Sequence, residues 1–121
     1  MLNELPFRQI HLDFHTSEHI HGVGDSFDPD DFAQTLKDAH VNSINLFARC
    51  HHGMLYYDSR FPNKHPHCQI DLLRQQIEAC KAVGIKTPIY VTAGWDEFVA
   101  RNHPEWLERT KDGRPFGAGP L

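Results

Sequence analysis

The sequence lacks the features that would place the protein in a membrane or on nucleic acid. It has no run of 18 apolar residues, so no membrane span is expected. Its first ten residues, MLNELPFRQI, have neither the basic end nor the apolar stretch of a signal peptide. The 12 basic residues are outnumbered by 16 acidic ones and form no basic block, so we expect no nucleic-acid partner.

Cysteine is also scarce. The three cysteines, Cys50, Cys68 and Cys80, are an odd number, and no two of them have C-x-x-C spacing. This pattern argues against a disulfide framework and predicts a reducing, cytoplasmic setting. Cys80 falls on the apolar stripe of a predicted helix, where we expect it to be a core residue.

What the sequence does contain is a strand–helix rhythm, repeated three times within 121 residues. Alternation of apolar and polar residues indicates the strands, and apolar stripes between capping residues indicate the helices. The first helix, for example, has Asp28 as a candidate N-cap and Pro29 at its first position. The predicted elements are strands near 8–14, 41–49 and 85–93 and helices near 28–40, 71–83 and 96–102.

This order of elements predicts an α/β fold with parallel strands, because a helix between two strands returns the chain for a right-handed crossover. The middle strand is expected to place Ile44, Leu46 and Ala48 on one face, and Asn45, Phe47 and Arg49 on the other. A helix-covered sheet face tolerates such polar residues poorly, whereas the mouth of a barrel accepts them. We therefore expect the N-terminal three units of a (β/α)₈ barrel. A whole barrel needs about 250 residues, so residues 1–121 would be one partial domain.

The first candidate site is the segment HLDFHTSEHIH at 11–21. Strand alternation places His11, Asp13 and His15 on one face at the end of the first strand. A hydrogen-bonded polar cluster that fixes the loop is one interpretation. A zinc or manganese site is another, since imidazole suits both metals, and His51 would then complete a set with these three residues.

The second candidate is CHHG at 50–53, where a buried strand ends on two adjacent histidines. His51 continues the inward series of the strand, and His52 can join it only if the strand ends between them. Gly53 makes such a turn inexpensive. Each neutral imidazole offers one donor and one acceptor, which suits sugar hydroxyls, although a solvated loop explains the pattern as well.

The end of the third strand, TAGWDEF at 92–98, contributes Trp95, which offers a flat face for a sugar ring. Asp96 is expected to cap the next helix, and Glu97 to lie in its first turn. A glycosidase needs two carboxyl groups facing each other across the scissile bond, and the sequence assigns no such pair here. A weaker cluster, NKHPHCQID at 63–71, lacks zinc-ligand spacing.

These segments resemble a known family. The likeness is carried by HLDFHTS, by FDPDDFAQTLKDAHVNSINLFARCHHGMLYYDS, by DLLRQQIEACKAVGIKTPIYVTAGWDE and by HPEW. Together they are similar to the amino-terminal part of the hypothetical glycosyl hydrolase 6 family of (β/α)₈ proteins, over nearly the whole chain from about residue 8. A more distant likeness is to α-L-fucosidase barrels, in which paired histidines at a strand end contact the sugar.

The resemblance implies a carbohydrate substrate, and we expect no cofactor. It carries a sugar-contacting role onto His51 and His52 and loosely onto His15. Trp95, Asp13 and Tyr57 are further candidates that the resemblance does not itself supply. In the fucosidases the nucleophile follows strand four and the acid/base comes later, so both would fall beyond Leu121 and this chain alone would be inactive. A metal-dependent hydrolase using His11, Asp13, His15 and His51 and a non-enzymatic binding module remain alternatives.

Overall fold

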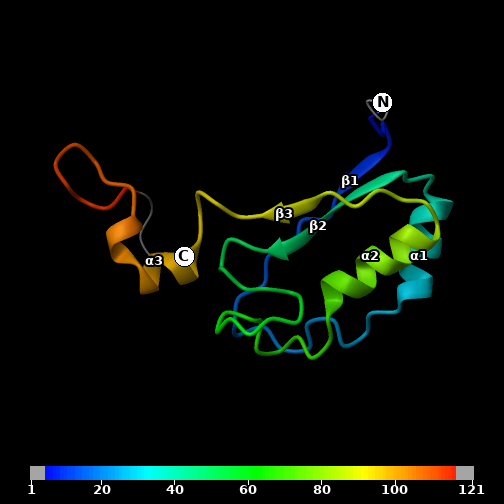
Figure 1. Cartoon of the computed structure of the whole chain (residues 1–121), viewed down its shortest axis with the longest axis horizontal. Helices are drawn as coiled ribbons and strands as arrows, with labels where there is room; N and C mark the ends of the chain where they lie inside the picture. The colour runs from blue at the N-terminus through cyan, green and yellow to red at the C-terminus, as the bar shows by residue number, and fades with distance from the viewer. Residues whose placement is uncertain (1–4, 117–121) are drawn as a thin grey trace.

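The computed structural model describes residues 5–116, so both ends of the predicted domain, 1–4 and 117–121, lie outside the described residues. The chain passes through its elements in an alternating order of strands and helices (Figure 1). They are β1 (Gln9–His11), α1 (Pro29–Asp38), β2 (Ser43–Arg49), α2 (Leu72–Ala82), β3 (Ile89–Val91), α3 (Glu97–Asn102) and the 3₁₀ turn η1 (Pro104–Trp106).

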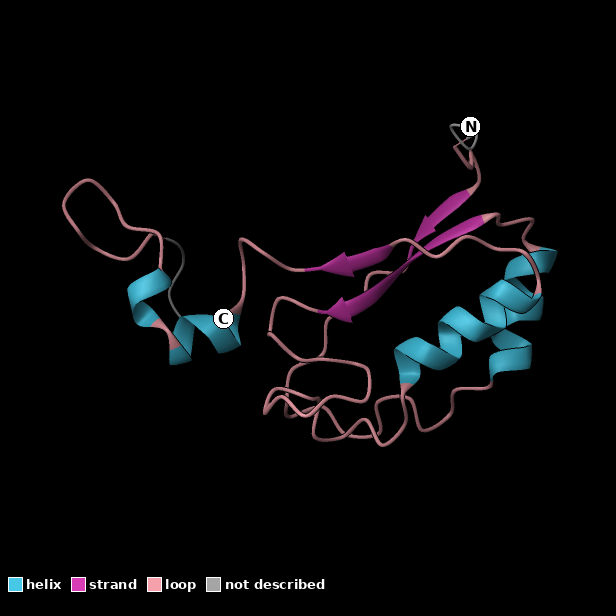
Figure 2. Cartoon of the chain, viewed as in Figure 1, coloured by secondary structure: helices cyan, strands magenta, loops and turns pink. Residues whose placement is uncertain are grey.

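The three strands form one parallel sheet in the order β1-β2-β3. Ile10 pairs with Ile44 across the first ladder, and Phe47 pairs with Tyr90 across the second. The helices α1 and α2 lie together on one side of the sheet, and the segment of α3 and η1 projects beyond the carboxyl ends of the strands (Figure 2). The predicted fold class, α/β with three consecutive parallel units, is confirmed.

The outer strands are shorter than predicted. The first was expected over 8–14, but its ladder ends at His11, after which Phe14 turns inward and packs against Tyr56 with the ring centroids 4.9 Å apart. The third was expected over 85–93, but only Ile89–Val91 is strand. Pro88 precedes that strand and has no N–H to donate, so the ladder is interrupted there and the strand pairing of Lys86 with Ser43 is an isolated bridge.

Local chemistry accounts for where the helices begin. The Asp28 carboxylate accepts hydrogen bonds from the backbone N–H groups of Asp30 and Asp31, both at 2.9 Å, so it caps α1. Asp71 caps α2 in the same way through the N–H of Arg74 at 3.0 Å. After α2 the chain reverses at Gly84, whose φ of +76° is available to glycine without strain.

Two hydrophobic clusters hold these elements together. The helix-side core joins the sheet to α1 and α2, and the loop-side core lies beneath the long segments 12–27 and 50–71. The helix-side core consists of Leu36, Val41, Ile44, Leu46, Ala48, Leu73, Cys80 and Ile85. The loop-side core consists of Val23, Phe47, Cys50, Met54, Tyr56, Cys68 and Leu72.

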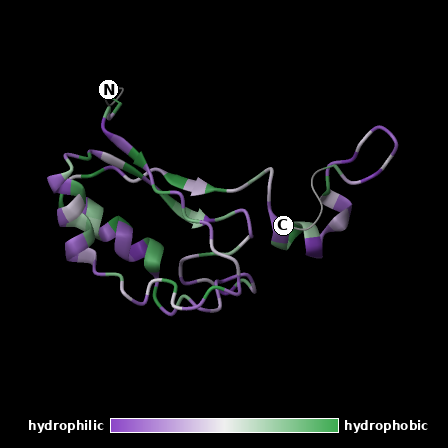
Figure 3. Ribbon diagram, turned by 180° about the vertical axis from the view of Figure 1, so that it is seen from behind, coloured by the Kyte–Doolittle hydropathy of each residue, from purple (hydrophilic) through white to green (hydrophobic). Residues whose placement is uncertain are grey.

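The alternation predicted for β2 is thereby confirmed, with Ile44, Leu46 and Ala48 in the helix-side core and Phe47 in the loop-side core. Figure 3 shows apolar residues in the strands and mostly hydrophilic residues in the loop beyond η1. The expected core position of Cys80 is also confirmed, and all three cysteines are buried free thiols. Within residues 5–116, no helix has the length and apolar character needed to cross a membrane.

The helix-side core generates a stability prediction. Leu46 is fully buried at its centre, so we expect Leu46→Ala to lower the free energy of unfolding by about 2–5 kcal/mol through lost transfer energy and a residual cavity. Leu5→Ala removes the same atoms from a residue that is 79% exposed and should change it by less than about 0.5 kcal/mol. Urea unfolding of both variants checks this, and equal losses would contradict the assignment of Leu46 to the core.

Candidate functional site

A tight turn directly after β2 builds the centre of the candidate site. The Gly53 N–H donates to the Cys50 carbonyl at 2.8 Å, and the Cys50 N–H donates to the Met54 carbonyl at 3.3 Å. The turn places the adjacent rings of His51 and His52 with their centroids 4.4 Å apart, although neighbouring side chains on a strand would diverge. This is the change of direction that Gly53 was expected to allow.

Gly53 also permits close contact with the start of α3. Its φ is +86°, and a Cβ at this position would lie 2.4 Å from Phe98 Cβ and 2.6 Å from Asp96 Oδ1. The Glu97 N–H donates to the His51 carbonyl at 2.8 Å across the same contact. The N-terminus of α3 is therefore seated directly on the histidine turn.

His15 approaches the turn from the segment after β1. Its ring stacks on that of His51, with centroids 3.9 Å apart and planes inclined by 20°. His15 Nδ1 accepts a hydrogen bond from the His51 backbone N–H at 3.2 Å, so Nε2 carries the proton of the neutral ring. Nε2 lies 2.9 Å from Asp13 Oδ1. Asp13 thus orients His15, and His15 supports His51.

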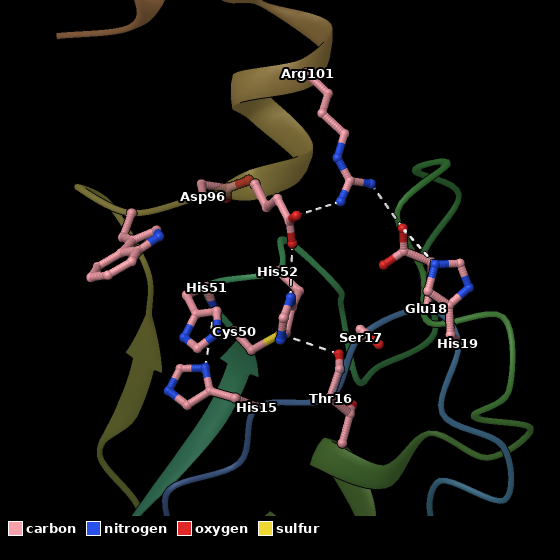
Figure 4. A network of polar contacts seen from close by, with 12 residues as sticks. His15, Thr16, Ser17, Glu18, His19, Cys50, His51, His52, Asp96 and Arg101 are labelled. Carbon is pink, nitrogen blue, oxygen red and sulfur yellow. Dashed lines mark hydrogen bonds and ion pairs between the residues drawn. The ribbon is translucent and has the colours of Figure 1, made fainter. Parts of the chain in front are cut away.

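His52 belongs to a chain of charged contacts (Figure 4). His52 Nδ1 lies 2.8 Å from Glu97 Oε2, and the other oxygen of Glu97 accepts from Arg101 at 2.5 Å. Arg101 in turn donates to Glu18 at 2.8 Å. The hydrogen bond with His52 lowers the pKa of Glu97, and the bond with Arg101 lowers the pKa of Glu18, so both carboxylates are held ionised.

Asp96 acts at the start of α3 in two ways. Its Oδ1 accepts from the Val99 N–H at 2.8 Å, which confirms the predicted N-cap. Its other oxygen forms an ion pair with Arg49 at the end of β2. The carboxylate therefore links α3 to the central strand, and each of its oxygens has a protein partner.

The remaining candidate residues are spread over the surroundings. Trp95 is exposed, and its ring centroid lies 6.0 Å from that of His51. His11 lies deeper along the sheet, against Phe47 and Tyr90. Tyr57 packs against the helix-side core and lines a hollow of about 400 Å³, and among the described residues it makes no ring contact with the histidines. The structure thus brings together His15, His51, His52, Asp13 and Trp95 and leaves Tyr57 apart.

The electrostatics favour the neutral form of the His51 imidazole. Burial lowers the pKa of His51, and the neighbouring His15 and His52 lower it further. No side-chain hydrogen bond of the His51 ring occurs within the described part of the chain. Its donor and acceptor nitrogens are therefore available to a polar ligand.

The geometry bears on metal binding as well. In residues 5–116, no group of three or more His, Cys, Asp or Glu side chains is arranged to hold a metal ion. His15 and His51 in particular do not point at one ion, because nitrogen lone pairs lie in the ring planes and the two planes are near-parallel.

Sequence reasoning did not find the Glu97–His52 contact, nor the roles of Arg101 and Glu18. One signal was present, because Glu97 and Arg101 are four residues apart and so share a helix face. Glu18 is 83 residues from Arg101, and no local pattern joins them.

Histidines, an exposed tryptophan and oriented carboxylates lie beyond the carboxyl ends of the parallel strands, where β/α folds place their ligand sites. Residues 28–120 match the family model described as hypothetical glycosyl hydrolase 6. The chain belongs to this family, which confirms the resemblance drawn from the sequence.

Solved structures agree with this assignment. The chain is 47% identical to α-L-fucosidase isoenzyme 2 from Paenibacillus thiaminolyticus, with a TM-score of 0.85. The match covers 91% of this chain but 17% of that one, so the chain corresponds to part of the barrel domain of a larger enzyme. A GH29 fucosidase from Ruminococcus gnavus, in complex with fucose, matches 90% of this chain and 25% of its own at 20% identity and a TM-score of 0.56, which shows a shared fold. Comparison with curated proteins gave no match.

The close contact between Gly53 and α3 predicts that adding a single methyl group at position 53 destabilises the fold. Gly53→Ala places a side chain at positive φ and against Phe98, so we expect it to lower the free energy of unfolding by at least about 1–2 kcal/mol. Gly94→Ala is the matched control, because a Cβ there meets no atom within 4 Å. Thermal or urea unfolding measures both, and a Gly53→Ala protein as stable as the control would show that this contact does not form.

The buried histidines predict a pH dependence of stability. Burial lowers the pKa of His65, as it does for His51, whereas an unfolded histidine keeps its ordinary value near 6.5. The unfolded chain then binds more protons than the folded chain below about pH 6.5. The contribution of these histidines to the free energy of unfolding is therefore fully present above that pH and is lost as the pH falls below it.

Urea midpoints at pH 7.5 and 5.5 measure this loss. His65→Gln should reduce the difference between the two midpoints, because the buried imidazole is removed. His19→Gln, at a side chain that is 84% exposed, should leave the difference unchanged. A His65→Gln protein with the pH dependence of the parent would refute the role of His65.

Proposed function

We propose that this chain forms part of the sugar-binding wall of a (β/α)₈ glycoside hydrolase that acts on α-L-fucosides. The observation that carries the proposal is the convergence of His15, His51 and His52 beyond the strand ends, in a chain 47% identical to an α-L-fucosidase. The reducing setting indicated by three free thiols supports a cytoplasmic location.

The chemistry of the wall suits a sugar. A pyranose ring presents hydroxyl groups, each of which donates and accepts hydrogen bonds, and an apolar face of C–H groups. Neutral imidazoles match the hydroxyls, and the exposed face of Trp95 matches the C–H groups. The lowered pKa of His51 keeps one donor and one acceptor on its ring at neutral pH.

We assign the carboxylates of this wall to holding neighbouring side chains in place, and not to cleaving the glycosidic bond. Asp13 contacts His15, Asp96 pairs with Arg49, and Glu97 is shared by His52 and Arg101. Hydrolysis of a glycoside needs two carboxyl groups roughly 5–9 Å apart across the bond, one of them free to attack or to activate water. We therefore assign the nucleophile and the acid/base to other parts of a complete barrel; the match to this chain covers 17% of the whole fucosidase chain.

Titration with free L-fucose tests the binding proposal. We expect chemical-shift changes at Trp95 and at the histidine turn, with a dissociation constant in the millimolar range, about −4 kcal/mol, because only part of the site is present. His51→Ala should weaken binding at least about tenfold through loss of two hydrogen-bonding groups. His103→Ala, outside the wall, should leave it unchanged.

L-rhamnose is the matched control ligand, since it is also a 6-deoxy-L-hexose but places its hydroxyls differently. Equal shifts with both sugars, or fucose binding that survives His51→Ala, would contradict the proposal. Hydrolysis of a nitrophenyl α-L-fucoside by the purified 121-residue chain would contradict the assignment of the cleaving groups to other parts of the barrel.

A further inference from the structure

The contact between His52 and Glu97 determines which nitrogen of the His52 ring carries a proton. An ionised carboxylate can only accept hydrogen bonds, so the ring nitrogen 2.8 Å from Glu97 Oε2 must carry a proton. That nitrogen is Nδ1. In the neutral ring, Nε2 is then left with a lone pair and no proton.

The second carboxylate oxygen of Glu97 also has a hydrogen-bond partner. Arg101, one turn further along α3, donates to Glu97 Oε1 at 2.5 Å and to Glu18 at 2.8 Å. Glu18 lies in the segment after β1, and His52 in the turn after β2. The side chain of Glu97 is therefore fixed between two elements, with both oxygens occupied.

His52 Nε2, in contrast, has no hydrogen-bond partner among the described residues. The His52 side chain is 19% exposed, so the ring retains contact with solvent. The ring lies 4.4 Å from that of His51, within the proposed wall. A lone pair that reaches solvent from an otherwise fixed ring is suited to accept a hydrogen bond from a ligand.

We propose that Glu97 is a positioning residue that holds His52 as the Nδ1–H tautomer, so that His52 Nε2 accepts a hydrogen bond from a hydroxyl of the bound sugar. The tautomer follows from the geometry alone, whereas its use in sugar recognition rests on the proposed function. Neighbouring His15 has the opposite tautomer, because its Nδ1 accepts from a backbone N–H and its Nε2 faces Asp13. The wall thus presents its histidines in different hydrogen-bonding states.

The tautomer can be read directly. Long-range ¹H–¹⁵N correlation spectra of the ¹⁵N-labelled 121-residue chain at pH 8 distinguish a protonated from an unprotonated ring nitrogen for each histidine, and His52→Gln assigns the His52 signals. We expect a protonated Nδ1 and an unprotonated Nε2 for His52. An Nε2–H form of His52 in the parent protein would overturn the proposal without any variant.

Glu97→Gln tests whether Glu97 sets the tautomer of His52. The amide can donate as well as accept, so the preference should disappear and the His52 signals should shift toward a mixture of tautomers. Glu105→Gln is the matched control, because Glu105 contacts His103 Nδ1 at 3.1 Å outside the wall, and it should leave the His52 signals unchanged. If Glu97→Gln fails to fold, Arg101→Gln loosens the same carboxylate and should broaden or shift the same signals. Unchanged His52 signals in the folded variant would overturn the proposal.

Fucose titration of the same samples separates this inference from the proposed function. Glu97→Gln should weaken fucose binding about tenfold, the size expected when one hydrogen bond to a fixed partner is lost. A tautomer that depends on Glu97 in a protein that binds no fucose would support the positioning role and reject the sugar-binding function. Fucose binding with a His52 tautomer that is independent of Glu97 would do the reverse.

Discussion

The candidate site depends on the direct contact between Gly53 and the N-terminus of α3. A side chain at position 53 would overlap Phe98 and Asp96, so only glycine lets the helix approach this closely. From that approach follow the hydrogen bond from Glu97 to the His51 carbonyl and the reach of Glu97 to His52. Moving α3 away from the turn by about 1–2 Å would break both hydrogen bonds, because donor–acceptor distances in proteins lie between about 2.7 and 3.2 Å. The absence of a side chain at Gly53 therefore allows the turn after β2 and the start of α3 to meet, although they are far apart in the sequence.

Sequence reasoning found those parts of the fold that local chemistry determines. The Asp28 and Asp96 caps, the alternation along β2 and the reversal at Gly53 all depend on residues within a few positions of one another. It overestimated the length of β1 and β3, since strand ends are decided by pairing with a neighbour and not by alternation. The link from Glu18 through Arg101 to His52 was out of reach for the same reason, because it is defined only once two loops and α3 are placed in space.

The charged chain around His52 contributes more to orientation than to stability. Ion pairs of partly exposed side chains add about 0–1 kcal/mol each, and Arg101 is 56% exposed. The stability of this region comes instead from the loop-side core, where buried Tyr56 accepts a hydrogen bond from the Thr16 N–H at 3.0 Å and so anchors the segment after β1 to the segment after β2. Packing holds the backbone in place, and the ion pairs then select one arrangement of the imidazole rings.

The central strand and the edge strand of the sheet are covered to different degrees. On β2, Leu46 and Ala48 are covered by the helix-side core, whereas Ile89 and Val91 on β3 remain 42% and 56% exposed. In a complete barrel the helix after each strand covers such positions, so stability is added strand by strand on the outer face. Polar groups gather independently at the strand ends, where they are free of that packing requirement. A segment of three strands can therefore carry an ordered set of histidines while the carboxylates around them are each in contact with a partner side chain. Under the proposed function, ordering the sugar-binding wall and cutting the bond are separable tasks on this fold, and the described residues would serve the first of them.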